Sequence, residues 1–191
     1  MIEANPSDKA VAILNSARAL MMERGYNGFS FRDVAAEVGI KSASIHYHFA
    51  TKADLAEATA HRYRAAFKEA TSEIGTGSAP DQMRAYGTLF VETLRNQGDL
   101  CLAGVLAADV SSLPEQVRTE VELFFAEQYD WVAAVLRQGQ ANGEIRKDLD
   151  ADQFARVFVA GLEGSMMVSR SIRQPQDLET SLDMLIRVAT S

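Results

Sequence analysis

The sequence of 191 residues has little of what several protein classes require. It has one cysteine, Cys101, so no disulfide can form within the chain. No run of about eighteen apolar residues occurs, and the first ten residues, MIEANPSDKA, lack the basic and apolar regions of a signal peptide. We therefore expect a cytoplasmic protein with no membrane partner.

Patterns that catalysis or metal binding requires are also missing. The sequence shows no nucleophile paired with a base, no paired-carboxylate motif, no phosphate-binding loop and no spacing of metal ligands. His46 and His48 are two residues apart, and side chains two apart on a helix point to different faces, which argues against a metal site. We predict that the protein is not an enzyme and holds no metal or cofactor.

The net charge of −7 is unevenly distributed. Residues 1–55 carry six basic and six acidic side chains, so the acidity lies in residues 56–191. A neutral head with Lys9, Lys41 and Lys52 can meet phosphates, while an acidic body discourages nonspecific wrapping by nucleic acid. The alternative is a solvated acidic surface with no such role.

Helix-favouring residues dominate the composition, and only four prolines occur. Capping-box patterns mark several helix starts. We predict an all-α fold of about nine helices in two domains, residues 1–50 and residues 51–191. The expected helices are 7–24, 31–38, 42–49, 51–74, 78–96, 99–108, 112–142, and two that begin near Asp150 and Pro175.

The most informative segment is FRDVAAEVGIKSASIHYHF, residues 31–49. Ser30 and Asp33 match a variant of the capping box, and Gly39 can adopt the positive φ that ends a helix. Ala35 is small enough to let a second short helix cross the first. Two short helices crossing at a tight turn are typical of a helix-turn-helix, whose second helix enters the DNA major groove.

The longer run GYNGFSFRDVAAEVGIKSASIHYHFATKADL resembles the N-terminal domain of TetR-family transcriptional regulators of the TetR/AcrR type. Ala50 departs from the family, which often has proline there. The resemblance implies a three-helix DNA-binding domain followed by a larger helical domain for ligand binding and dimerisation. It is carried by residues at the ends and turns of the expected helices: Gly25-Tyr26, Phe29, Ala35, Gly39, Phe49 and Thr51-Lys52.

The second helix of the motif and the flanking helix starts carry the candidate DNA contacts. The Tyr47 hydroxyl can donate to a phosphate, and His46 and His48 can donate to a phosphate or accept from a base edge. The alternative is that one of them packs against the helix expected at residues 7–24. Helix N-termini offer free amides to phosphates. The predicted DNA-binding residues are Ser30, Arg32, Lys41, Ser42, Ser44, His46, Tyr47, His48, Thr51 and Lys52.

So few base contacts in one head favour a homodimer on a palindromic, two-fold symmetric double-stranded DNA operator. Small residues in the penultimate helix permit close helix approach, and leucines recur at helical spacing in the last helix. These residues form either a four-helix dimer interface or a core within one chain. The predicted interface is Ala160, Gly161, Gly164, Ser165, Leu178, Leu182, Leu185 and Ala189.

Aromatic and apolar residues at helical spacing in the body form either a ligand cavity or an ordinary core, and the resemblance favours the cavity. Their chemistry suits a small apolar or aromatic effector of unknown identity. The predicted pocket residues are Tyr86, Phe90, Cys101, Leu102, Val105, Leu106, Phe124, Phe125, Gln128, Trp131, Phe158, Leu162 and Met166.

The sequence and the resemblance together predict a ligand-responsive transcriptional regulator, a repressor that an effector releases from DNA. A ligand would shift the packing of the body and tilt the long helix that starts near Thr51, moving the heads out of groove spacing. Two alternatives stay open. One is a constitutive DNA-binding dimer without an effector, and the other is an electrophile or redox sensor acting through Cys101.

Overall fold

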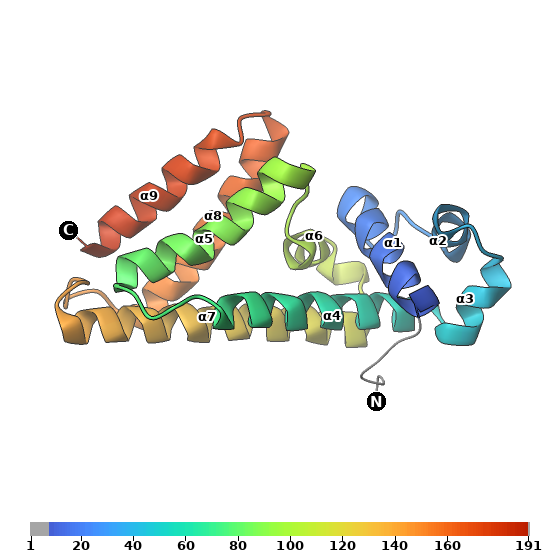
Figure 1. Cartoon of the computed structure of the whole chain (residues 1–191), viewed down its shortest axis with the longest axis horizontal. Helices are drawn as coiled ribbons and strands as arrows, with labels where there is room; N and C mark the ends of the chain where they lie inside the picture. The colour runs from blue at the N-terminus through green and yellow to red at the C-terminus, as the bar shows by residue number, and fades with distance from the viewer. Residues whose placement is uncertain (1–7, 191) are drawn as a thin grey trace. The chain divides into compact units, whose positions relative to one another are not determined.

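The computed structural model describes residues 8–190, without the side chains of Asn96 and Gln97. In this part of the chain all regular structure is helical, which confirms the predicted all-α fold of about nine helices (Figure 1). None of these helices combines the length and apolar character needed to cross a membrane. The elements are α1 (Asp8–Arg24), α2 (Phe31–Val38), α3 (Ser42–His48), α4 (Lys52–Ser72), α5 (Ala79–Gln97), α6 (Leu102–Ala108), the 3-10 helix η1 (Val110–Ser112), α7 (Glu115–Asn142), α8 (Ala151–Ser171) and α9 (Gln176–Thr190).

Most helices begin and end close to their sequence signals, but the starts of α6 and α7 differ. α6 begins at Leu102, so Asp99 does not cap it. Ser112 lies in η1, where its hydroxyl donates to the Asp109 carbonyl at 2.9 Å, and α7 begins only at Glu115. The helix start expected at residue 112 is therefore wrong, because the Ser112 hydroxyl bonds within the turn of η1 and does not cap α7.

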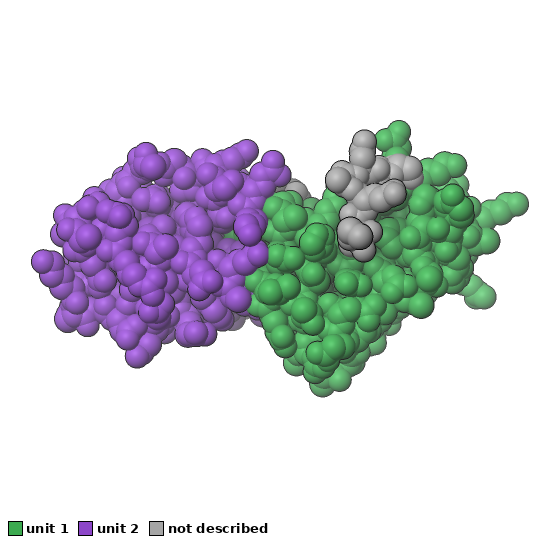
Figure 2. Space-filling view, turned by 90° about the horizontal axis from the view of Figure 1, so that it is seen from below, with its two compact units in different colours: residues 1–67, 102–124 green, residues 68–101, 125–191 purple. Residues whose placement is uncertain are grey.

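The chain forms two compact units that interleave along the sequence (Figure 2). Unit 1 comprises the residues up to Phe67 together with Leu102–Phe124, and unit 2 comprises Lys68–Cys101 together with the residues from Phe125 onward. The expected boundary at residue 50 stays a prediction. Residues 102–124, which the sequence places in the body, pack with the N-terminal segment in unit 1.

The core of unit 1 is built around α1, which packs against α2 and α6. Ile13 and Met21 of α1 are fully buried, as the helical spacing of its apolar residues requires. Val34 of α2 and Ile45 of α3 are also 0% exposed. Each short helix is therefore anchored by a buried aliphatic side chain.

The core of unit 2 forms where α5, α8 and α9 pack together. Tyr86 and Phe158 are fully buried, and Leu178 is 0% exposed. Gly87 of α5 permits close helix approach, because a Cβ atom built there would lie 2.4 Å from the Leu182 side chain of α9. A larger residue at position 87 therefore requires the Leu182 side chain to move.

Gly39 allows a direct test of the helix-turn-helix backbone. Its φ is 72°, and no atom lies within 4 Å of a Cβ built there, so substitution reports backbone strain alone. We predict that Gly39→Ala lowers the free energy of unfolding by about 1 kcal/mol, and that Gly39→Asn costs less because asparagine tolerates this conformation. Urea unfolding measures both, and equal losses would contradict the argument.

Candidate nucleic-acid interface and candidate pockets

The start of α2 is fixed by a reciprocal capping box. The Ser30 amide donates to Asp33 Oδ2 at 2.7 Å, and the Asp33 amide donates to Ser30 Oγ at 3.4 Å. The side-chain hydrogen bond from Ser30, at 2.6 Å, lowers the pKa of Asp33. Because these bonds set the first turn, the exposed Arg32 side chain starts from a fixed backbone.

Helix α3 presents most of its surface to solvent. It has seven residues, of which only Ile45 is buried. Tyr47 is 88% exposed, the largest exposure among the large hydrophobic side chains of the described residues. An exposed aromatic side chain with a hydroxyl, carried on a helix anchored by one buried isoleucine, is suited to contact another surface.

The two histidines of α3 differ in their surroundings. His46 packs edge-on against Phe31 of α2, with ring centroids 4.7 Å apart, and its Nδ1 lies 3.2 Å from the Ala50 carbonyl. The ring of His48 contacts that of Tyr47 at 5.2 Å. His46 therefore helps to hold α3 against α2, although its side chain remains exposed. Its predicted contact with DNA stays a prediction.

The start of α4 is fixed in two ways. Thr51 and Asp54 form a second reciprocal capping box, with hydrogen bonds of 2.9 and 3.1 Å. The Lys52 ammonium lies 4.7 Å from the ring centroid of Tyr26 and 4.5 Å from that of Phe29. Burial lowers the pKa of Lys52, and the charge of Asp33 opposes this. Lys52 thus fastens α4 to the α1–α2 connection by cation–π contacts.

All ten predicted DNA-binding residues lie in unit 1, at the start of α2, on or just before α3, and at the start of α4. They come from three successive helix starts and one short exposed helix. Their contact with DNA stays a prediction. Exposed among them are Ser30, Arg32, Lys41, Ser44, His46, Tyr47 and Thr51, whereas Ser42, His48 and Lys52 are half-buried.

Contacts from residues 102–124 to this region were missed by sequence reasoning. Asp109 Oδ2 accepts the Tyr26 amide at 3.1 Å, and the Asn27 amide group donates to Ser112 Oγ at 2.7 Å. Gln116 of α7 donates to Asp54 at 3.2 Å. No sequence signal identifies these partners, because each pair is more than sixty residues apart. They join the α6–α7 connection to the helix-turn-helix.

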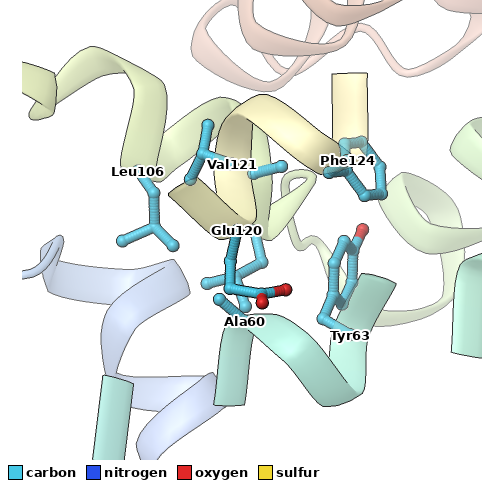
Figure 3. Close-up of a pocket in the computed structure, with 8 residues that line it drawn as sticks. Ala60, Tyr63, Leu106, Glu120, Val121 and Phe124 are labelled. Carbon is cyan, nitrogen blue, oxygen red and sulfur yellow. The ribbon is translucent and has the colours of Figure 1, made fainter. Parts of the chain in front are cut away.

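A small pocket lies in unit 1 between α4, α6 and α7 (Figure 3). It encloses about 180 Å³, part of which is open to solvent. The Tyr63 and Phe124 rings stand beside each other with centroids 5.6 Å apart. Leu102, Leu106 and Phe124 of the predicted pocket line it, whereas Val105 does not. The other lining residues are Ala60, Tyr63, Ala103, Glu120 and Val121.

A charged cluster borders this pocket. Arg64 Nε of α4 donates to Glu120 Oε2 of α7 at 2.9 Å, and His61 Nδ1 lies 3.4 Å from Glu120 Oε1. The Arg64 and Glu120 side chains are only 15% and 11% exposed, so this ion pair is better shielded from solvent than a surface pair. It ties the middle of α4 to α7.

The other predicted pocket residues lie in unit 2, where aromatic rings dominate. Tyr86 stacks on Trp131 with centroids 5.3 Å apart and an interplanar angle of 18°, and it also contacts Phe90 and Phe158 at 5.5 and 6.0 Å. Trp131 is half-buried, so the cluster reaches the surface. The remaining predicted residues in this unit are Cys101, Phe125, Gln128, Leu162 and Met166, of which all but the half-buried Phe125 are buried.

Glu163 of α8 is the residue in unit 2 that sequence reasoning missed. It is 9% exposed, and its Oε1 atom has no hydrogen-bond partner among the described residues. Burial raises its pKa to about 7, against a lowering by a hydrogen bond with Cys101. The available signal was a lone carboxylate in the otherwise uncharged run VFVAGLEGSMMVS.

The expected dimer face divides between the inside and the outside of unit 2. Leu178, Leu182 and Ala189 are at most 3% exposed, so they are buried within the unit, and their place in a dimer interface stays a prediction. Ala160 and Gly164 are exposed, and Gly161, Ser165 and Leu185 are half-buried. The exposed apolar residues around them are Val157, Met167 and Val168 of α8, Ile172 directly after α8, and Met184 and Val188 of α9.

Two protein-family models match the chain. The model described as "Bacterial regulatory proteins, tetR family" matches residues 13–59, which contain α2 and α3. The model described as "Tetracyclin repressor-like, C-terminal domain" matches residues 80–185, more than half of the chain.

Individual proteins are similar over nearly the whole length. The HTH-type transcriptional repressor DhaR of Mycobacterium sp. (strain GP1) is 25% identical over 176 residues, covering 91% of this chain and 88% of that protein. A TetR-family regulator from Agrobacterium tumefaciens superposes with a TM-score of 0.93 at 32% identity, covering 98% of this chain and 100% of its own. A TetR regulator from Legionella pneumophila gives 0.84 at 27% identity, with coverages of 99% and 100%.

The buried Glu163 predicts a pH-dependent stability. A carboxyl pKa raised from 4.5 to about 7 by folding contributes stability that is present below pH 4.5 and lost as the pH rises through 7. Glu163→Gln keeps the size and removes the charge. We predict that the variant gains stability relative to the wild type between pH 5 and pH 8, by at most roughly 3 kcal/mol. Thermal unfolding at both pH values measures this, and a constant difference would contradict it.

Proposed function

We propose, from the premise that this chain belongs to the TetR family of DNA-binding bacterial transcriptional regulators, that it is a repressor released from its operator by a small effector. Regulators of this family are non-enzymatic transcription factors, which confirms the predicted absence of enzyme activity. The observation that carries the proposal is the exposed face of α3, with Tyr47 88% exposed above the buried Ile45.

On this proposal α3 enters the major groove. Lys41, Ser44 and the histidines meet base edges, and Tyr47 donates its hydroxyl to a phosphate. The backbone amides at the starts of α2 and α4 donate hydrogen bonds to neighbouring phosphates, because each helix N-terminus carries a partial positive charge. The capping boxes of Ser30 and Thr51 hold these amides in place. Such contacts set the register, whereas α3 reads the sequence.

Two copies bind a two-fold symmetric operator on this proposal. Val157, Gly161, Gly164 and Val168 recur every three or four positions on α8 and form one stripe, which continues at Ile172 directly after the helix. Gly161 is half-buried and the other four residues are exposed. Glycines within the stripe let a second helix approach closely, and the apolar side chains supply buried area. These features support pairing of α8 and α9 with their copies in a second chain.

Effector binding in the body changes the position of the reading heads on this proposal. α4 and α7 both continue from one unit of the chain into the other. Within unit 1, the Arg64–Glu120 pair and the bonds made by Gln116 and Asp109 connect the α6–α7 region to the helix-turn-helix. A shift of α7 therefore reaches the start of α4 through defined contacts.

The two alternatives predict different behaviour. A constitutive dimer gains no thermal stability from any effector, whereas a repressor with a ligand site does. A sensor acting through Cys101 needs an accessible thiolate, but Cys101 is 2% exposed and lies beside Glu163, whose carboxylate repels a thiolate. These features favour effector binding over thiol chemistry.

Selection from random double-stranded DNA tests the operator. We expect enrichment of a two-fold site whose half-site centres lie about 34 to 36 Å apart, or a multiple of this distance. Failure to enrich any symmetric site at low salt would overturn the dimeric operator.

Tyr47→Phe tests the reading helix. The side chain is 88% exposed, so the variant keeps its stability and loses only a hydroxyl. We predict that operator affinity falls about tenfold, because a hydrogen bond to a charged phosphate is lost. Fluorescence anisotropy at fixed salt measures this. Tyr129→Phe, a matched change on α7, leaves affinity unchanged, and equal effects of the two substitutions would contradict the assignment.

Val168→Glu tests the dimer. Val168 is 58% exposed and belongs to the α8 stripe, so a charge there penalises a buried interface without disturbing the unit itself. We predict a monomer by sedimentation velocity, together with weaker operator binding. Val110→Glu places the same charge at a 45% exposed position outside α8 and α9, and it leaves the dimer intact. A dimeric Val168→Glu variant refutes this interface.

A further inference from the structure

Glu163 is a buried carboxyl group without a cationic partner among the described residues. Its pKa responds to burial and to the Cys101 thiol, and no cationic side chain contributes. Its Oε1 atom makes no hydrogen bond to any described residue. A carboxylate held in this way is costly, because burial removes its hydration without supplying an opposite charge. The site therefore has an acceptor oxygen to offer to a donor from outside the chain.

Aromatic rings surround the same position. Glu163 and Cys101 both interact electrostatically with Tyr86, whose burial is the main cause of its raised pKa. Tyr86 in turn stacks on Trp131 and contacts Phe158. The faces of aromatic rings carry negative potential and attract cations, most strongly for tryptophan. We name these five residues, Glu163, Cys101, Tyr86, Trp131 and Phe158, the carboxylate–aromatic cluster.

The outer side of this region already shows a cation–π contact. Tyr129, which interacts with Tyr86, lies under the guanidinium of Arg156 at 5.0 Å from its ring centroid. Trp131 is half-buried, so one ring of the cluster is partly open to solvent, whereas Glu163 is 9% exposed. Aromatic faces with a terminal carboxylate form a site that accepts an organic ammonium group and its apolar substituent.

We propose that the carboxylate–aromatic cluster binds an organic ammonium cation that carries an aromatic or alkyl group, with the ammonium donating to Glu163 Oε1. This inference rests on the proposed effector-responsive function and names the chemical class of the effector. It differs from the expectation of an uncharged apolar effector, because α8 carries a carboxylate that the apolar pattern conceals. The rings hold the apolar part, and the carboxylate selects the charge.

Binding of an ammonium group changes the protonation of Glu163. The titratable groups that interact with it are the Cys101 thiol and the Tyr86 hydroxyl, and Tyr129 lies beyond Tyr86. A cation favours the ionised carboxyl group, so the proton of the neutral acid leaves to the buffer while the carboxylate–ammonium pair forms. Because burial raises this pKa to about 7, part of the carboxyl population is protonated at pH 7 and gives up its proton when the cation binds.

Three molecules of matched shape test this proposal by isothermal titration calorimetry with the full chain: 4-phenylbutylammonium, the neutral 4-phenylbutan-1-ol and the anionic 5-phenylpentanoate. We expect the ammonium compound to bind at least about tenfold more tightly than the alcohol, and the anion to bind weakest. Repeating the titration in buffers of different ionisation enthalpy measures the released proton. A residue with a purely structural role would not produce this proton release.

Glu163→Gln removes the preference for the cation and the proton release, while Asp130→Asn, a loss of one exposed charge on α7, keeps both. Equal binding of ammonium and alcohol by the wild type overturns the proposal, as does a preference that survives in Glu163→Gln. Binding of none of the three compounds at millimolar concentration also overturns it. Operator affinity is measured in the same preparations without these compounds. A protein that binds its operator but none of the cations therefore contradicts the cation site and not the DNA-binding function.

Discussion

The hydrogen bond from the Tyr26 amide to Asp109 is the contact on which the arrangement of unit 1 depends. Asp109 lies so close to Gly25 that a Cβ atom built there would be 2.5 Å from its Oδ2 atom. The carboxylate can take this position because residue 25 has no side chain. This contact brings the α6–α7 connection onto the turn that precedes α2. The reading helix is consequently supported from residues more than eighty positions away in the chain.

Around this contact, short-range interactions determine where helices begin, and long-range interactions determine how the helices pack. Capping boxes at Ser30 and Thr51 determine where α2 and α4 begin, and they act within four residues. Lys52, resting on the Tyr26 and Phe29 rings, and Gln116, bonded to Asp54, determine how those helices sit against the rest of the unit. A regulator needs both kinds of interaction. Short-range bonds shape the surface that meets DNA, and long-range bonds connect this surface to the rest of the protein.

This division also explains what could be predicted from the sequence. Caps, glycine turns and the helix-turn-helix were predictable because their signals lie within a few residues, as at Ser30, Gly39 and Thr51. Asp109 and Glu163 were not, since their roles arise from partners distant in sequence and from burial. The amphipathic pattern of α9 showed which residues are apolar, but not that Leu178 and Leu182 are already buried within unit 2, where α9 packs against α5 and α8.

The interleaving of the units has a consequence for synthesis on the ribosome. Residues up to Phe67 emerge first, but unit 1 also needs Leu102–Phe124, which follow an intervening segment of unit 2. At about 5–20 residues per second, the N-terminal helices wait several seconds for Asp109 and Gln116 to appear. A nascent chain that already contains the whole helix-turn-helix therefore still lacks the hydrogen bonds that Asp109 and Gln116 make to Tyr26 and Asp54.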